Sequence, residues 1–563
     1  MSRLLDQPVM MPYKLRPTSE REKRQDGENH TKKDENIIVN VSKLLPLLTD
    51  IHRSSCKVPK LSMTIEKRLG LCVFVKLRCA VCKYESPVMP LSETVKEENR
   101  PGPPSGVLNS QAILPVMKSK MGVDDLRYVF TCLNIEPPSR SILQKKLNTF
   151  SDRMVELGEE QLEENRQFVE EVTRVATGQP FADVSFDVAY SGRPLSGGET
   201  AKQSFGGLFE HTTSQKLPLA IAIANKHCRL KNCTHKDDQP RCRRTYPADK
   251  TIASSERTLL HRVLRKVRPL PVRSITTDAS TQEAKAIRDF YAHEPEKPAH
   301  NKCFIHKGRT FEKHVKRLNL KSIPKGNNKT TYKNKLASAI RQRIEAELQN
   351  LAKTRQEFDR TKGVSAINNV VPCFAGDHTD CRVLSTVCKA HHETYTPSHL
   401  PHGRDLELKQ WDLRTIQDCI ERHFNAQALE SIPKLFNTNS CESMHSTIFA
   451  YAPKTTRYTR NFGGLAHSAV HSRTLGTGKA TVKLAARVGV DIEKNAVMQK
   501  RLDKIDANRR YHAERKATPQ YKLRRYNLRR RQANRQEFAA GSLYSADSAA
   551  STSAQDHSYG LNF

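Results

Sequence analysis

The chain has 563 residues and a mass of 63.9 kDa, which is too long for one ordinary domain and predicts about two to four. Its 94 Lys and Arg residues against 60 Asp and Glu residues give a net charge of +34, which favours an acidic polymer, nucleic acid first, as the partner. Apolar residues make up 37% of the chain, and this composition excludes a collagen, a coiled-coil rod and a wholly disordered protein.

No segment predicts a membrane span or a secretory signal. The longest strongly apolar run, residues 217–224, is far too short to cross a bilayer, and the first 25 residues lack an apolar core followed by a small-residue cleavage site. The 14 cysteines are therefore expected to be thiols and metal ligands rather than disulfides. A basic protein of this kind is expected in the nucleus, and the plain alternative is a ribosome-associated or merely soluble basic protein.

The N-terminal third predicts a tail, a small module and a helical region. Residues 1–35 are polar and charged and are expected to be disordered. Within 36–100 we expect a zinc-ribbon-like module: a strand leading into a short helix over 36–60, a β-hairpin edge with two cysteines over 71–84, and a linker over 85–108. The helical region 101–178 is expected to contact DNA and holds two short amphipathic helices at 109–121 and 123–135. A long helix then starts at Ser139 and ends near Gly178.

From residue 181 the apolar pattern changes to that of a mixed α/β sheet. Five strands are predicted, with turn residues or helices between them: 181–190, 205–213, 217–227, 272–280 and 302–308. Helices return over 331–360, where Leu336, Ile340, Ile344 and Leu348 form one row, and over 405–450 around a loop at 437–440. Residues 481–563 predict a basic helix and a disordered tail.

Three acidic residues stand at suggestive places in this pattern. Asp187 lies within the first strand of the sheet, Asp278 ends the fourth strand, and Glu442 lies at the start of a helix. Converging carboxylates are what two-metal phosphoryl chemistry needs, and their hard oxygen atoms suit Mg²⁺. On spacing alone the signal is weak, because an Asp at a strand end is commonly a turn residue and a Glu near a helix start is commonly a capping partner.

Cysteine and histidine residues gather in sets with metal-ligand spacing. Two sets offer four zinc ligands each: Cys228, Cys233, His235 and Cys242, and Cys373, His378, Cys381 and Cys388. Two pairs have the same kind of spacing, Cys79 with Cys82, to which Cys56 could add a third ligand, and Cys303 with His306. Zinc is favoured for the sets of four, whereas for the pairs zinc and a role as small buried apolar residues are equally plausible.

Residues 500–535 are dominated by Lys and Arg with tyrosines among them. Arg524, Arg525, Arg529, Arg530 and Arg531 are the candidate DNA-binding residues of this segment. Arg neutralises phosphates, so such binding should weaken steeply with salt. A nuclear-import signal has the same composition, and both roles are compatible. A Gly-rich phosphate loop and a nucleophile elbow are absent from the sequence.

Several segments resemble those of Mutator-like transposases of the animal type. They are VSFDVAYSGRP, IAIANKHCRLKNC, SITTDASTQEAK, KCFIHKGR, CFAGDHTDCRVLSTVC and, most specifically, NTNSCESMHSTIFAYAPK around Glu442. The helical segment NSQAILPVMKSKMGVDDLRYVFTCLNI resembles the part that precedes the catalytic core in such proteins. The similarity covers roughly residues 36–480.

The resemblance implies an RNase H-like catalytic domain over residues 179–480, with a helical insertion at about 310–430. It implies Asp187, Asp278 and Glu442 as ligands of catalytic Mg²⁺ or Mn²⁺, and it matches Cys303 and His306 to a family signature after the second Asp. The implied function is metal-dependent cleavage and strand transfer of double-stranded DNA, at transposon ends and target, by a possible homo-oligomer.

The neighbours of Asp187 and Asp278 depart from the family pattern, because Val188 and Ala189 follow the first Asp and Thr277 and Ala279 flank the second. A catalytically inactive, transposon-derived, zinc-containing DNA-binding protein is therefore the alternative. A zinc-stabilised RNA-binding protein that uses the Arg and Tyr residues of the C-terminal segment is a further one.

Overall fold

A computed structural model describes residues 36–543, apart from 50–55, 97–103, 193–200, 229–232, 234–241, 279–280, 324–327, 355–358, 389, 391–396, 398, 402–404, 457, 491 and 493–495. The predicted tails at 1–35 and 544–563 lie outside the described residues. The chain divides into two compact units: unit 1 extends to Asn109 and includes Tyr128–Pro138, and unit 2 contains Ser110–Arg127 and the chain from Ser139 onward. The domain boundaries expected from the sequence stay predictions.

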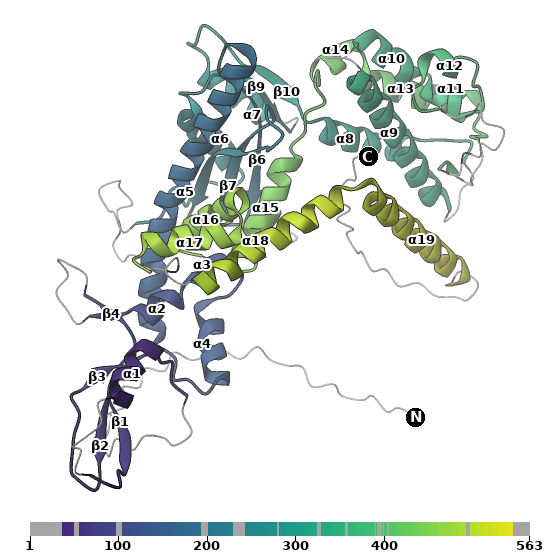
Figure 1. Ribbon diagram of the computed structural model, residues 1–563. Helices are drawn as coiled ribbons and strands as arrows, with labels where there is room; N and C mark the ends of the chain where they lie inside the picture. The colour runs from purple at the N-terminus through teal and green to yellow at the C-terminus, as the bar shows by residue number, and fades with distance from the viewer. Residues whose placement is uncertain are drawn as a thin grey trace, which may run out of the picture. The chain divides into compact units, whose positions relative to one another are not determined.

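Unit 1 is built on a three-stranded antiparallel sheet in the order β1-β2-β3 (Figure 1). Strands β1 (Leu61–Leu69) and β2 (Cys72–Cys79) form a hairpin whose turn contains Gly70 at φ +65°, a conformation that suits glycine. The expected hairpin edge over 71–84 is present as β2, and its partner in the hairpin is the preceding strand β1. The expected helix is present as α1 (Val41–Thr49), but residues 36–40 form no strand.

The remaining strands of unit 1 are very short. They are β3 (Met89–Pro90), β4 (Thr94–Val95) and β5 (Ser105–Gly106), all within the segment predicted as a linker. Val73, Val75 and Leu91 pack with Leu47 of α1 in a small core. A core of this size is weak support for an independent module, so other stabilising contacts are needed.

The helices predicted over 123–135 and from Ser139 are confirmed as α4 (Val123–Cys132) and the long α5 (Arg140–Thr177). The single helix predicted over 109–121 is divided into α2 (Val107–Gln111) and α3 (Leu114–Lys118), and Pro115 lies in the first turn of α3, where proline suits a new helix start. Ser139 caps α5 by accepting a hydrogen bond from the backbone N–H of Ile142, and Gly178 ends the helix at φ +81°. The start and stop signals in the sequence therefore locate this helix closely.

Unit 2 contains a five-stranded mixed sheet in the order β10-β9-β6-β7-β8. Strands β6 (Ala182–Tyr190), β7 (Gln203–Glu210) and β8 (Pro218–Asn225) form an antiparallel meander, while β9 (Val272–Thr277) and β10 (Ala299–Lys302) run parallel to β6. Four of the five predicted strands are confirmed. The fifth is wrong beyond Lys302, because Phe304 already begins helix α8 (Phe304–Arg317) with Cys303 as its N-cap.

Helices cover both faces of this sheet. Val184 and Phe186 of β6 pack in one core with α6 (Ser255–Val267) and α7 (Thr281–Phe290). Ser185, which lies between them in the strand, instead contacts Cys441 of α15 (Asn439–Tyr451). Because successive strand residues point to opposite faces, α15 lies on the face opposite α6 and α7.

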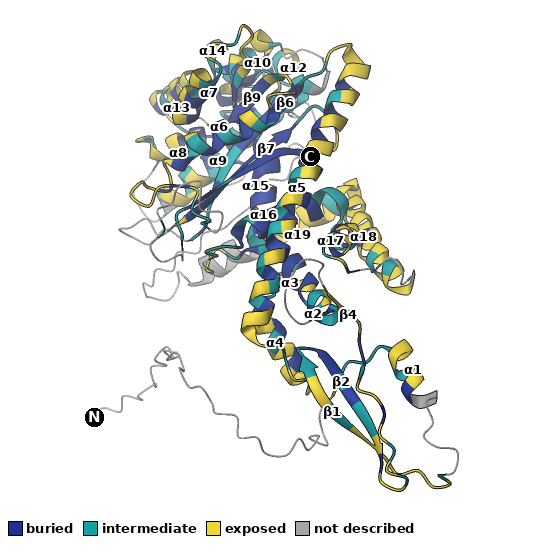
Figure 2. Ribbon diagram, turned by 90° about the vertical axis from the view of Figure 1, so that its left-hand side faces the viewer, coloured by how far each residue is buried: buried dark blue, intermediate teal, exposed yellow. Residues whose placement is uncertain are grey.

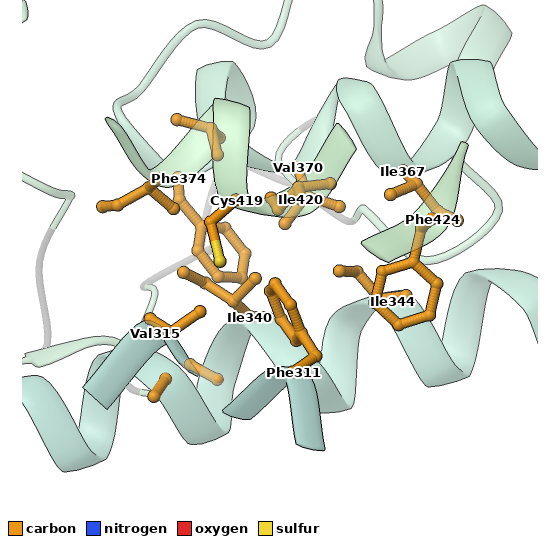
Figure 3. Close-up of a cluster of buried hydrophobic side chains, with 14 of the residues drawn as sticks. Phe311, Val315, Ile340, Ile344, Ile367, Val370, Phe374, Cys419, Ile420 and Phe424 are labelled. Carbon is orange, nitrogen blue, oxygen red and sulfur yellow. The ribbon is translucent and has the colours of Figure 1, made fainter. Parts of the chain in front are cut away.

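A helical insertion separates β10 from α15 and has a core of its own. It contains α8, α9 (Asn328–Thr354), α10 (Arg360–Asn368), α11 (Val370–Phe374), α12 (Cys381–Leu384), α13 (Gln410–Phe424) and α14 (Ala426–Glu430). Figure 3 shows side chains such as Phe311, Ile340 and Phe424 meeting in this core. The backbone N–H groups of Lys302 and Phe304 donate to the carbonyls of Ser431 and Phe436, so the two ends of the insertion adjoin.

The C-terminal helices are α16 (Phe462–Leu475), α17 (Thr477–Arg487), α18 (Ala496–Ala517) and α19 (Pro519–Leu543). Figure 2 shows that α18 and the described side chains of α19 are mostly exposed. Asp506 of α18 is an exception, because its carboxylate is buried and accepts from the backbone N–H groups of Gly478 and Lys479 at 2.9 Å. This cap on the first turn of α17 fixes α18 to it.

Lys118 of α3 is buried, and its Nζ lies 3.3 Å from the hydroxyl of Ser472. Burial lowers the pKa of Lys118 to about 7, well below its value of about 10.4 in an unfolded chain. At a pH between these two pKa values, Lys118 is protonated in the unfolded chain and neutral in the folded chain. The free energy of unfolding should therefore rise as pH rises from about 7 to about 10. We expect Lys118→Met to stabilise unit 2 at pH 6 by on the order of 3 kcal/mol and to remove that rise.

Urea unfolding followed by circular dichroism at pH 6, 7 and 9 measures this effect. Lys120→Met is the matched control, since Lys120 lies two residues away and is exposed. A Lys118→Met variant that is less stable than the wild-type chain at pH 6 would contradict the argument.

Candidate active site

The register of two neighbouring parallel strands brings the first two candidate carboxylates together. Ser185 of β6 pairs with Thr276 of β9. Asp187 and Asp278 each lie two residues further along, at the same edge of the sheet. Neighbouring strands are roughly 4.8 Å apart, so the two side chains project from adjoining positions. Asp187 is 18% exposed and Asp278 36% exposed, which leaves both accessible to a small ion.

Helix α15 positions the third carboxylate through a buried cysteine. The Cys441 side chain is fully buried, with its Sγ 3.3 Å from the Ser185 hydroxyl and 3.9 Å from the Gly207 carbonyl oxygen of β7. Gly207 is the partner of Asp187 in the β6–β7 ladder, so the helix rests directly over the strand that carries Asp187. Glu442 follows Cys441 in the first turn of α15 and is thereby held at this edge.

The three carboxylates affect one another electrostatically. Burial, with the negative charges of Asp278 and Glu442 adding to it, raises the pKa of Asp187 to about 8, against the effect of its own hydrogen bond from the Val188 N–H. A carboxylate whose pKa is raised in this way lacks enough positive charge around it. A divalent cation supplies that charge, and three carboxylates are the donor set that Mg²⁺ prefers. The residues present therefore fit a divalent metal.

Two basic side chains of α8 lie among these acids. His306 Nδ1 is 2.8 Å from Asp278 Oδ1, and its Nε2 is 3.6 Å from Glu442 Oε1. Burial opposes its charge, but hydrogen bonds to Asp278 and Cys303 outweigh that and raise the pKa of His306 to about 10. Arg309, one turn closer to the C-terminus of α8, places Nη1 3.3 Å from the same Glu442 oxygen.

The Cys303 and His306 pair, which the spacing suggested as zinc ligands, lies at the carboxylates. Ligand atoms of Asp278, Cys303 and His306 all lie within 4.8 Å of one another. Thr438, just before α15, contacts all three, with its hydroxyl 3.4 Å from each of the Asp278, Cys303 and His306 side chains. The pair thus lies beside a carboxylate of the candidate active site, whereas the other sets contain only cysteine and histidine. Zinc binding by Cys303 and His306 stays a prediction.

Three residues at this edge were missed from the sequence. Arg309 is one, and Glu283 of α7 and His445 of α15 are the others; both of the latter are buried. His445 Nδ1 lies 3.5 Å from Asp187 Oδ2, and burial raises the pKa of Glu283 to about 9. The three-residue interval between Glu442 and His445, which places both on one side of a helix, is the signal that could have found His445. Glu283 has no comparable signal.

The set Cys373, His378, Cys381 and Cys388 converges in the insertion. All four ligand atoms lie within 4.8 Å of one another. The surroundings also suit thiolates, because the Asn369 side-chain amide donates to Cys381 Sγ at 3.3 Å and the Arg343 guanidinium approaches Cys373 Sγ at 3.7 Å. Four convergent S and N ligands are the composition of a closed structural zinc site.

Two further cysteine sets each bring three sulfur atoms within 4.8 Å of one another. In unit 1, Cys56 joins Cys79 and Cys82, as the sequence had suggested. In unit 2, Cys228, Cys233 and Cys242 come together, while His235, their predicted fourth ligand, lies outside the described residues. Within the described part of the chain, each of these sets therefore offers three of the four ligands of a tetrahedral zinc site.

The candidate DNA-binding arginines lie on α19. The side chains of Arg524, Arg525, Arg529 and Arg531 are exposed, whereas that of Arg530 lies outside the described set. Exposure of this kind is what contact with phosphates requires. Across the described helices, none has both the length and the apolar character needed to cross a membrane.

Comparison with known proteins relates the chain to a family. The family model described as "Mutator-like transposase" matches residues 35–388, which is more than half of the chain and includes Asp187 and Asp278. No curated protein matches the chain. The order of strands and the convergent carboxylates accompany this match, and the chain belongs to the Mutator-like transposase family.

Proposed function

We propose that this protein is a DDE-type DNA transposase with an RNase H-like catalytic domain, and that Asp187, Asp278 and Glu442 are its catalytic acids. The observation that carries the proposal is their convergence: two lie at adjoining positions of parallel strands, and Glu442 is fixed above them by the packing of Cys441. Three strands in a meander followed by two parallel strands on the other side of β6 support the RNase H-like assignment.

The proposed reaction has two in-line displacements at phosphorus. Water attacks a phosphodiester at the element's end, and the freed 3′-OH then attacks target DNA. A pair of bound Mg²⁺ or Mn²⁺ ions would activate the attacking oxygen and stabilise the leaving oxygen. The chain's own part is to hold three carboxylates at one sheet edge and to place Arg309 beside them, where its charge can face a scissile phosphate once Glu442 has another partner.

Other regions have supporting roles in this proposal. The exposed arginines of α19 and the basic side chains of α18 contact the phosphates of double-stranded DNA, and zinc stiffens the insertion and the hairpin of unit 1. The protein acts in the nucleus, where its substrate is, and homo-oligomerisation would let two copies hold the two transposon ends.

A strand-nicking assay tests the function. Purified protein is incubated with a supercoiled plasmid that carries the DNA flanking its own coding locus, with Mg²⁺, with Mn²⁺ or with neither. We expect nicks at the ends of the locus only when a divalent metal is present. Nicking that is random in position or independent of added metal would contradict the proposal.

One observation favours a second candidate, a catalytically silent DNA-binding protein. His306 and Arg309 already neutralise much of the charge of Asp278 and Glu442, so the acidic cluster can persist as a folded site without any cation. Tight, salt-sensitive binding to the same plasmid with no nicking in either metal would select this candidate.

A further inference from the structure

Unit 2 contains a cavity of about 380 Å³ away from the carboxylates, and its lining is unusual. It lies between the N-terminal part of α5, the segment that follows α15, and the chain near Cys228. Three arginines and two tyrosines contribute to its wall: Arg140, Arg243, Arg460, Tyr451 and Tyr458. The volume is in the lower part of the range of small-molecule sites, roughly 300–1,000 Å³, and suits a single nucleoside rather than a duplex.

Two of the three arginines are held in place by one shared carboxylate. Asp152 of α5 accepts from Arg243 through one carboxylate oxygen and from Arg460 through the other, both at 2.8 Å. Arg140 is paired with Asp124, 3.0 Å away. The three guanidinium groups and the two carboxylates that pair with them leave one net positive charge at the cavity wall, which favours an anionic ligand such as a phosphodiester.

Two polar atoms of the wall have unused hydrogen-bonding capacity. Asn461 is 93% buried and its Nδ2 donates to Asn148 Oδ1 at 3.1 Å, but its Oδ1 meets no donor among the described residues. The buried Nε of Arg460 likewise meets no acceptor there. One free acceptor and one free donor on consecutive residues match the edge of a nucleobase, which presents amine donors beside ring-nitrogen or carbonyl acceptors.

Helix α15 connects this cavity to the carboxylates. Tyr451, the last residue of α15, follows Glu442 by nine positions, which corresponds to roughly 13 Å along the helix axis. Duplex DNA rises about 3.4 Å per nucleotide of a strand, so a strand that follows α15 from the carboxylates would reach the cavity after about four nucleotides. Aromatic rings such as those of Tyr451 and Tyr458 are the usual stacking partners of unpaired bases.

We infer that this cavity binds one unpaired base of a DNA strand, at a position about four nucleotides from the phosphodiester that lies at the carboxylates. The inference rests on the proposed function, which supplies the DNA. Asn461 and Arg460 read the base edge, the tyrosines stack on the base, and Arg140 and Arg243 hold the adjoining phosphates.

Fluorescence anisotropy with short duplexes tests the inference, in an Asp278→Asn background with Mg²⁺ so that no DNA is cut. One duplex has blunt ends. The others carry a five-nucleotide single-stranded extension at the 5′ or the 3′ end, and each extension is made both with normal nucleotides and with abasic nucleotides. We expect the extension with bases to bind at least about fivefold tighter than the blunt duplex, the lower limit for one stacked base. Asn461→Leu and Arg140→Gln should each remove most of this preference.

Arg153→Gln is the matched control, because Arg153 lies on α5, is exposed and pairs with Glu156, as Arg140 pairs with Asp124. It should keep the full preference. The inference would be overturned if blunt and extended duplexes bound equally, or if abasic extensions kept the preference. It would also be overturned if Arg153→Gln lost the preference for extended duplexes as much as Arg140→Gln does. Micromolar binding of free dAMP without any preference for extended DNA would overturn the assignment to a DNA strand.

Nicking by the wild-type chain is measured in parallel. Intact nicking without a preference for extensions would refute the base site alone. Absent nicking with an intact preference would refute the catalytic proposal alone.

Discussion

Asp278→Asn should lower the rate of metal-dependent nicking by about a thousandfold or more while leaving DNA binding intact. Asp278 is the most exposed of the three acids and lies beside Asp187 at the edge of the sheet. The Asn amide keeps the shape of the Asp side chain but removes one of the negative charges that bind a divalent cation. A thousandfold lower rate corresponds to a loss of about 4 kcal/mol of transition-state stabilisation. Rates of supercoil loss in Mg²⁺ measure the effect.

Asp289→Asn is the control for that experiment, since Asp289 lies on the surface end of α7 and pairs with Arg257. It makes the same chemical change in the same region and should leave the rate unchanged. Asp278→Cys sharpens the test, because a thiolate suits Mn²⁺ better than Mg²⁺. We expect partial activity of this variant in Mn²⁺ and none in Mg²⁺. Full activity of Asp278→Asn would refute the assigned mechanism.

Cys381→Ser should release one equivalent of zinc and unfold part of the insertion. Cys381 belongs to the set of four ligands that converges beside α9 and α11, and it is 6% exposed. Structural zinc contributes on the order of 10 kcal/mol to the folding of small zinc domains, which is comparable to the whole stability of a typical domain, about 5–15 kcal/mol. We expect a lower melting temperature and a loss of helical circular dichroism.

Zinc content by elemental analysis, combined with thermal unfolding, checks this result. Cys419→Ser is the matched control, because Cys419 is buried in the same core of the insertion and lies outside the ligand set. It should destabilise the core modestly and leave the zinc content unchanged. Equal zinc in wild-type and Cys381→Ser protein would show that the set holds no ion.

The sequence predicts the long α5 and the sheet well because their signals are local and strong. The Ser139 cap and the Gly178 stop mark the two ends of α5, and the short apolar segments predicted as strands overlap β6, β7, β8 and β9. The segment after Lys302 was misassigned because Cys303, Phe304 and Ile305 are as apolar as a strand. The helix begins there because Cys303 ends the strand and Phe304 enters the core of the insertion.

The candidate site was only partly predictable. The three acids could be proposed, but their meeting depends on the register of β6 with β9 and on Cys441, neither of which has a local signal. Glu283 and Arg309 come near the acids through the way α7 and α8 pack against the sheet. The sequence pattern predicts that helices are present but not where each of their side chains lies. Metal-ligand spacing, by contrast, located all four members of the Cys373 set and suggested Cys56.

The adjoining ends of the insertion have a consequence for how such proteins can change. The chain leaves the sheet after Lys302 and returns at Ser431, and one backbone hydrogen bond joins these two positions. Helix α8 belongs to the acidic edge, because His306 and Arg309 contact Asp278 and Glu442, but the part of the insertion that follows α8 can be lengthened, shortened or exchanged without altering the distance from Asp278 to Glu442. A foreign helical module grafted between the end of α8 and Ser431 should preserve the acidic edge, which makes this part of the insertion the natural place to give the scaffold a new target preference.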